Sequence, residues 1–94
     1  MTEIRDNKDR SQYEVTLDGS TAYVAYDREG ADRIVFTHTV VPEALSGRGL
    51  AGEIVKYALD DARAQGLRVV PQCTYVQSYL KRHPEYEDLV TTTP

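Results

Sequence analysis

The sequence predicts an α+β fold in the order β-β-β-α-β-α: an antiparallel three-strand meander, a crossover helix, one parallel strand and a last helix. Three observations lead to this class. Apolar and polar residues alternate on both sides of Asp18-Gly19, a dipeptide typical of two-residue hairpin turns. Gly47 and Gly49 then precede a long helical pattern of apolar residues. Residues 67–70, after Gly66, form a short strand, and because a helix connects it to the third strand of the meander the two should lie parallel.

The strands of the meander are predicted from period-two patterns. Residues 13–17 alternate as a half-buried strand, and residues 21–26 should return antiparallel after the turn. A longer strand runs from about residue 33 to residue 41, is rich in β-branched residues, and ends before Pro42, which has no N–H to donate. Residues 1–12 are polar, and we expect this start of the chain to be partly flexible.

The crossover helix is the clearest single element. Its apolar residues share one face at helical spacing: Leu50, Ala51, Ile54, Val55, Ala58, Leu59 and Ala62. Gly66 supplies the C-terminal stop, and residues 67–70 form the parallel strand. Thr74-x-x-Gln77 matches a capping box that would open a second helix through about Arg82, with a proline just beyond it.

Composition limits the classes of function. Ninety-four residues with 40% apolar and 28% charged side chains predict one globular domain spanning residues 1–94. The net charge of −4 argues against non-specific binding to nucleic acid or to an anionic membrane. The single cysteine, Cys73, and the widely spaced His38 and His83 offer neither a disulfide nor a metal-ligand spacing. The charged N-terminus carries no signal pattern, so we expect a cytoplasmic protein, monomeric or weakly dimeric, without a metal.

The glycine loop predicts an anion site. Gly47 and Gly49 let the backbone approach a ligand closely, and the helix that follows begins with N–H groups that lack internal partners. Such a helix start suits a phosphate or pyrophosphate. With Gly52 the loop formally matches a dinucleotide fingerprint, but no carboxylate lies about 20 residues further on, and no Lys-Ser or Lys-Thr pair makes a Walker loop.

Motifs along the chain extend this interpretation. Residues 44–49 fill the pattern Gln/Arg-x-x-Gly-x-Gly/Ala, although Ala44 and Ser46 lack the polar and charged side chains usual there. Further motifs occur in order: Asp18-Gly19, Ala22-Tyr23, Tyr26, His38-Thr39-x-Val41-Pro42, Gly49-Leu50-Ala51, Pro71-x-Cys73-x-Tyr75-Val76 and His83-Pro84-Glu85-Tyr86. In these the chain resembles the small stand-alone N-acetyltransferases of the GNAT superfamily, over about residues 7–90.

The resemblance implies a minimal GNAT fold that uses acetyl-CoA. The loop amides would hold the CoA pyrophosphate, and the third strand would pair with the pantetheine arm through Val40. The loop residues implied are Gly47, Arg48, Gly49, Leu50 and Ala51. The acceptor would be an amine such as a lysine side chain, a polyamine or a small metabolite. Two rival functions remain, a module that binds CoA or acyl-CoA without turnover and a protein-interaction domain.

Three residues are candidates for the chemistry. Cys73, at the end of the parallel strand, could accept the acetyl group as a nucleophile. His38 could activate it or serve as the base, since imidazole titrates close to neutral pH. Tyr79 matches the superfamily's acid tyrosine, with Tyr75 as the second choice. Each has a structural alternative: Cys73 as a small buried hydrophobe, His38 as a hydrogen-bonded core histidine, and both tyrosines as packing residues.

Overall fold

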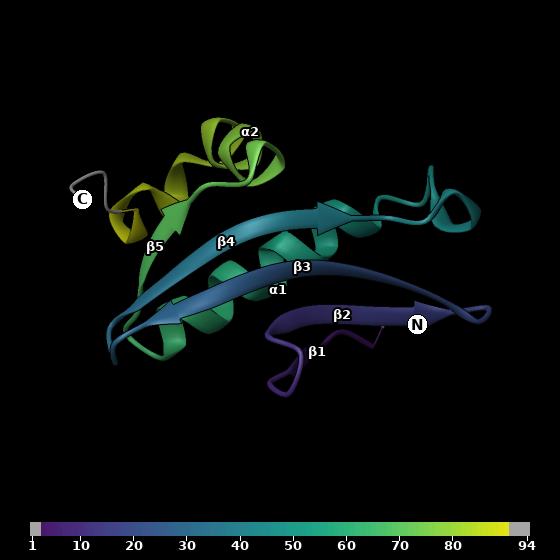
Figure 1. Cartoon of the computed structure of the whole chain (residues 1–94). Helices are drawn as coiled ribbons and strands as arrows, with labels where there is room; N and C mark the ends of the chain where they lie inside the picture. Colours follow the sequence, from purple (N-terminus) through teal and green to yellow (C-terminus); the bar gives the residue numbers. More distant parts are fainter. Residues whose placement is uncertain (1–2, 91–94) are drawn as a thin grey trace.

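The computed structural model describes residues 3–90 and confirms the predicted α+β class (Figure 1). Its elements are β1 (Arg5–Asn7), β2 (Gln12–Leu17), β3 (Ser20–Glu29), β4 (Arg33–Val40), the 3-10 helix η1 (Glu43–Leu45), α1 (Leu50–Ala64), β5 (Arg68–Pro71), α2 (Thr74–Arg82) and the 3-10 helix η2 (Pro84–Leu89). The strands form one sheet in the order β1-β2-β3-β4-β5. As expected, β2, β3 and β4 pair antiparallel and β4 pairs with β5 in parallel, and β1 adds a further antiparallel pair with β2.

The first strand, β1, is an addition to the predicted meander. It pairs with β2 so that Arg5 lies opposite Glu14 and Asn7 opposite Gln12. Its outward side chains are polar, and Asp6 accepts a hydrogen bond of 2.6 Å from the hydroxyl of the buried Tyr26. A strand held by polar contacts lacks the apolar alternation by which strands are predicted. Residues 1–2 of the segment expected to be flexible lie outside the described residues.

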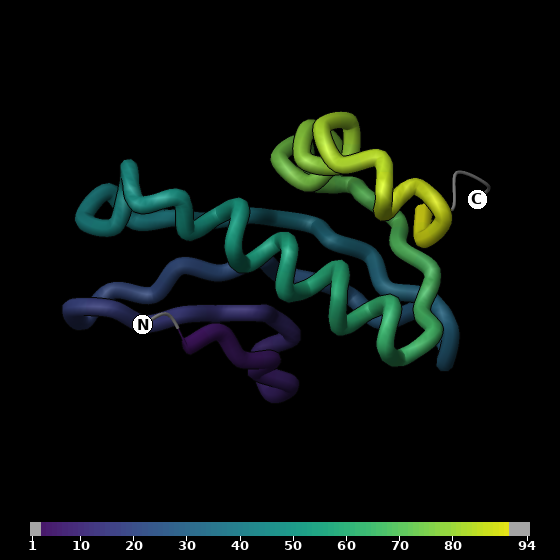
Figure 2. Tube along the Cα trace, turned by 180° about the vertical axis from the view of Figure 1, so that it is seen from behind, coloured from purple at the N-terminus to yellow at the C-terminus, as the bar shows by residue number. Residues whose placement is uncertain are grey.

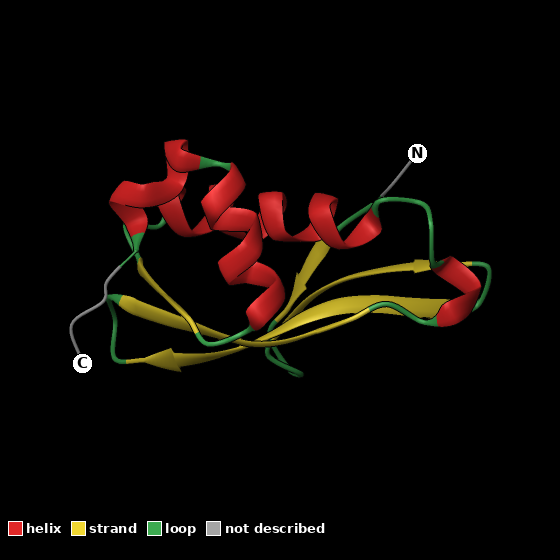
Figure 3. Ribbon diagram, turned by 90° about the horizontal axis from the view of Figure 1, so that it is seen from above, coloured by secondary structure: helices red, strands yellow, loops and turns green. Residues whose placement is uncertain are grey.

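The core lies between the sheet and α1. The predicted apolar face of α1 is buried, except that Ala51 is only half-buried: Leu50, Ile54, Val55, Ala58, Leu59 and Ala62. Gly66 follows the helix at a φ of +71°, as expected of a C-terminal glycine. Figure 2 shows α1 running along the back of the strands, and Figure 3 shows α1, α2 and η2 on one side of the sheet. The opposite face carries no helix of the described residues. Among residues 3–90, no helix is long and apolar enough to cross a membrane.

The start of α2 differs from the prediction. The capping box was wrong, because Cys73 is the N-cap and Thr74 is already the first helical residue. The Cys73 N–H donates to the carbonyl of Phe36 at 2.9 Å, which fixes the point where the chain leaves the sheet. The Gln77 side chain donates instead to the carbonyl of Pro71 at 2.8 Å. The end of α2 is as predicted, at Arg82.

Candidate active site

A β-bulge in β4 decides which side chains reach each face of the sheet. Tyr26 of β3 lies opposite Phe36, but the preceding residue, Ala25, lies opposite His38. Thr37 is therefore the extra residue, and its hydroxyl donates to the carbonyl of Ala25 at 3.3 Å. An extra residue of this kind reverses the alternation of side chains beyond it.

The reversal moves His38 away from the core. Thr39 lies opposite the buried Val24 and so faces the helices, whereas His38 and Val40 face the open side of the sheet. His38 is exposed, and Val40 is 39% exposed. The alternative that His38 is a core histidine was wrong, because it assumed an unbroken alternation from Phe36 onward.

Beyond the bulge, β4 and β5 separate. Their last pair is Phe36 with Pro71, and the N–H groups of Gln72 and Cys73 both donate to the Phe36 carbonyl, at 3.0 and 2.9 Å. The chain then turns into α2 and leaves an opening of about 370 Å³. This opening, the slot, is lined by Thr37, His38, Thr39, Val40, Gln72, Cys73, Thr74 and Tyr75. The slot brings together three of the predicted site residues: His38, Val40 and Cys73.

Within the slot, Cys73 is paired with a residue that the sequence analysis did not select. A hydrogen bond of 3.1 Å joins Cys73 Sγ to Thr39 Oγ1. Cys73 itself is 7% exposed, and its carbonyl accepts the N–H of Gln77 in the first turn of α2. Strict alternation from Phe36 would put Thr39 on the open face, away from Cys73. Only knowledge of the bulge could have identified Thr39 as the partner of this thiol.

The two candidate tyrosines occupy different places. Tyr75 lines the slot, whereas Tyr79 is buried between α2 and α1 and stacks on His83 with ring centroids 4.0 Å apart. Burial is the main cause that raises the pKa of Tyr79, which therefore keeps its proton at neutral pH. The Tyr75 hydroxyl lies 3.5 Å from where a Cβ on Gly52 would stand. Tyr75 thus connects the slot with the first turn of α1.

The glycine loop has the backbone geometry expected of an anion site. Gly47 and Gly49 have φ values of +78° and +72°, and a Cβ on either would meet nothing within 4 Å. Their conformation, and not lack of space, requires glycine. The first hydrogen bond of α1 runs from the Glu53 N–H to the Gly49 carbonyl at 3.2 Å, so the amides of residues 50–52 precede the helical ladder. The Leu50 side chain is buried, which leaves its amide as the group that could meet a ligand.

Arg48 is the cation of this loop, and it has a partner. Its guanidinium lies 3.3 Å from the carboxylate of Asp18 in the β2–β3 turn, and both side chains are exposed. Exposed pairs of this kind are worth about 0–1 kcal/mol, so an anionic ligand could compete for Arg48. Within residues 3–90 no cluster of three or more His, Cys, Asp or Glu residues has an arrangement that could hold a metal.

Comparison with known proteins adds four findings. A family model described as GCN5-related N-acetyl-transferase matches residues 12–89. The chain is 34% identical to protein NATD1 of Mus musculus over 83 residues, covering 86% of this chain and 76% of that protein. With protein NATD1 of Danio rerio it shares 33% identity over 87 residues, 88% and 79% of the two chains. A solution structure of a GCN5-like protein from Staphylococcus aureus superposes with a TM-score of 0.75 at 21% identity, covering 98% of this chain and 90% of that one, and so has the same fold.

Proposed function

Because this chain belongs to the GCN5-related N-acetyl-transferase family, we propose that it transfers an acetyl group from acetyl-CoA to an amine. One observation supports the proposal most directly. Tyr75 lines the slot, and its hydroxyl lies 3.5 Å from the position of a Cβ on Gly52, just after the glycine loop, so the slot and the loop are adjacent. A ligand with an anionic end and an extended arm ending in a reactive group would fit such a path. Acetyl-CoA supplies the acetyl group as a thioester, and the family generally uses it.

The loop is suited to the pyrophosphate. The amides of residues 47–51 surround the start of α1, where the helix dipole also favours negative charge. Arg48 would exchange its Asp18 partner for a phosphate oxygen. The exposed edge at Val40 would pair with the amides of the pantetheine arm, in the opening where β4 no longer contacts β5.

Cys73 is the proposed acceptor of the acetyl group in a two-step route. The Cys73 thiol gives its proton through a water molecule to His38, which lines the same opening from the open side of the sheet, and the sulfur attacks the thioester carbon. A new S–C bond forms there, the C–S bond to CoA breaks, and the leaving thiolate takes a proton from a tyrosine hydroxyl. The tyrosinate regains its proton from protonated His38, so both side chains return to their starting forms. The amine then attacks acetyl-Cys73, an N–C bond replaces the S–C bond, and His38 carries the amine's surplus proton to the released Cys73 thiolate.

Thr39 and the tyrosines would assist these steps. The Thr39 hydroxyl holds Cys73 Sγ at the wall of the slot. Tyr79 keeps its proton and is the predicted donor to the thiolate, and Tyr75, which lines the slot, is the alternative donor. In the direct route the amine attacks the thioester itself, with His38 as base, and Cys73 is not acetylated.

The test is a titration of acetyl-CoA into isotope-labelled protein, followed by mass spectrometry. We expect saturable amide shifts at residues 47–51 with responses at Val40 and Cys73, and an acetyl group on Cys73 that disappears when an amine is added. Binding without transfer to any amine would favour the non-catalytic CoA-binding module, which the lack of a carboxylate on β4 beyond Arg33 also favours. Absence of shifts at millimolar acetyl-CoA would contradict the proposal and favour an interaction domain.

A further inference from the structure

The open face of the sheet carries a second hollow, on the strands that precede the slot. It has a volume of about 440 Å³ and is shaped by β1, β2, β3 and the β1–β2 turn. We call it the outer hollow; its lining residues are Arg5, Asn7, Arg10, Gln12, Glu14, Thr21 and Tyr23. None of these residues has a role in the chemistry described above.

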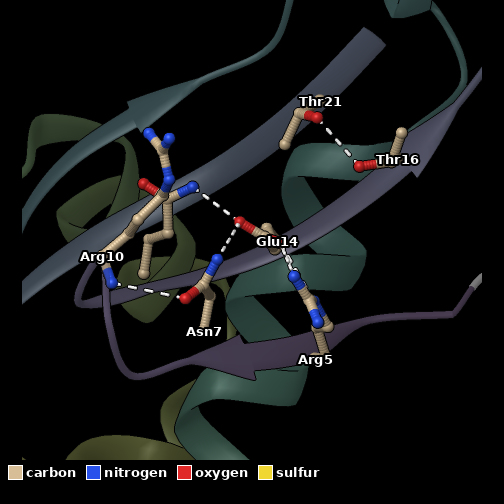
Figure 4. A network of polar contacts seen from close by, with 7 residues as sticks. Arg5, Asn7, Arg10, Glu14, Thr16 and Thr21 are labelled. Atoms are coloured by element: carbon tan, nitrogen blue, oxygen red, sulfur yellow. Dashed lines mark hydrogen bonds and ion pairs between the residues drawn. The ribbon is translucent and has the colours of Figure 1, made fainter. Parts of the chain in front are cut away.

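Glu14 organises this hollow. Its side chain is only 9% exposed and accepts hydrogen bonds from Arg5 Nε at 3.0 Å, Asn7 Nδ2 at 3.2 Å and Gln12 Nε2 at 2.7 Å (Figure 4). The bonds from Gln12, Arg5 and Asn7 outweigh the effect of burial and lower the pKa of Glu14, so the carboxylate stays charged at neutral pH. Arg5 already balances that charge, with its Nη2 2.9 Å from the carboxylate.

Arg10 then leaves the outer hollow with a net positive charge. Its backbone N–H donates to Asn7 Oδ1 at 3.3 Å, which holds the β1–β2 turn in place (Figure 4). The lining residues include two arginines, Arg5 and Arg10, and one carboxylate, Glu14. In a chain of net charge −4, such a local excess of positive charge attracts anions. Arginine is also the side chain best shaped for a carboxylate or phosphate.

Strand register puts the outer hollow beside the slot. Tyr23 of the outer hollow lies directly opposite Val40 of the slot on the same face. In the next row Gln12 and His38 are separated by Ala25 alone, a small side chain. Neighbouring strands lie about 4.8 Å apart, so one or two strand spacings, roughly 5–10 Å, separate the two sites.

From this geometry we infer that the outer hollow binds an anionic group of the acceptor while the amine of the same molecule lies in the slot. The inference rests on the proposed function and narrows its substrate class to an amine with a carboxylate roughly 5–10 Å away. Among the acceptors that the family resemblance implies, it favours one that carries both charges over a polyamine, which carries only positive charge. The carboxylate could belong to a free diamino acid or to an acidic residue next to a lysine in a peptide.

A pair of matched probes tests the inference. 6-Aminohexanoate and hexylamine share an amine and a six-carbon chain, but only the first has a carboxylate. In titrations of the labelled protein, we expect 6-aminohexanoate to shift the amides of Gln12 and Tyr23 and to bind roughly fivefold or more tightly than hexylamine. Arg10→Gln should abolish this preference. Arg28→Gln, which removes another exposed arginine near the far end of β3, should keep it.

Other outcomes would overturn the inference. Equal binding of the two probes, or an unchanged preference in Arg10→Gln, would mean that the outer hollow does not recognise the carboxylate. If the protein binds the carboxylate but shows no amide shifts at residues 47–51 with acetyl-CoA, the outer hollow would not be a binding site for the acceptor. Failure of the proposed function is therefore seen at the loop, and failure of this inference at β2 and β3.

A second set of probes tests whether the carboxylate belongs to a peptide or to a free amino acid. Capped Lys-Glu and Lys-Gln dipeptides differ in one charge beside the reactive lysine. Faster acetylation of Lys-Glu, with loss of the difference in Arg10→Gln, would support the inference and identify a peptide acceptor. A preference limited to free lysine over cadaverine would support it with a small-molecule acceptor, and no preference in either pair would contradict it.

Discussion

The glycine loop and the slot would hold the two ends of one ligand, yet they are built in different ways. The loop depends on its backbone: Gly47 and Gly49 have left-handed φ values, while the Leu50 side chain is buried. The slot depends on side chains, with Cys73 and Thr39 brought within 3.1 Å by a bulge and a strand separation. The loop should therefore be sensitive to backbone conformation, and the slot to single functional groups.

The largest effect should come from removing the thiol of the slot. With Cys73→Ala we expect transfer to an amine to fall at least about 100-fold, because the acetyl group loses its first acceptor. The loop should still bind acetyl-CoA with a Kd within about twofold of the wild-type value, since Cys73 contributes nothing to it. Single-turnover transfer and calorimetry measure the two quantities. Full activity in this variant would exclude the covalent route and leave direct attack.

Two glycine substitutions test the loop. Gly49→Ala should lower the free energy of unfolding by about 1–2 kcal/mol, because alanine is strained at a φ of +72°. Gly52→Ala is the matched control, with ordinary helical geometry and a new Cβ at contact distance, 3.5 Å, from the Tyr75 hydroxyl. It should be neutral or stabilise α1 by up to about 1 kcal/mol. Urea unfolding measures both, and equal losses would contradict the distinction.

Substitutions of Thr39 test whether acetylation of Cys73 depends on the hydrogen bond between the two side chains. Thr39→Val keeps the shape of the side chain and removes the hydroxyl from Cys73 Sγ. We expect acetylation of Cys73 to slow about tenfold, with the Kd for acetyl-CoA unchanged, because a bond to a sulfur that becomes charged is lost. Thr39→Ser should restore the rate. A similar loss in Thr39→Ser would instead point to packing of the γ-methyl group.

The smallest effect should appear at the edge of the loop. Asp18→Asn keeps a residue that tolerates the φ of +52° but removes the charge that holds Arg48. Freed Arg48 should tighten acetyl-CoA binding by up to about fivefold, the range of an exposed ion pair. The gain should shrink as salt is raised. A weaker Kd would show that Asp18 positions Arg48 for the ligand.

The fold was predictable because most of its elements are local. The helical face from Leu50 to Ala62, the Asp18-Gly19 turn and the stop at Gly66 each depend on neighbouring residues alone. β1 was missed because its partners are polar, and Thr39 because a bulge leaves no mark in the residue pattern. Cys73 could be selected by type and position, but its partner depends on how two distant strands meet.

The bulge at Thr37 decides which side chains of β4 can reach Cys73. In a regularly paired β4 that kept Thr37 in the ladder, His38 would follow Phe36 toward the helices and Thr39 would face the open side. Because Thr37 is the extra residue, Thr39 faces the helices instead, while Ile34, Phe36 and the whole of α1 belong to the same core in either case. Regular pairing would leave the composition and the charge of the chain unchanged but would separate Thr39 from Cys73. One local choice of strand pairing, made outside the core, therefore determines the partner of the only thiol in the sequence.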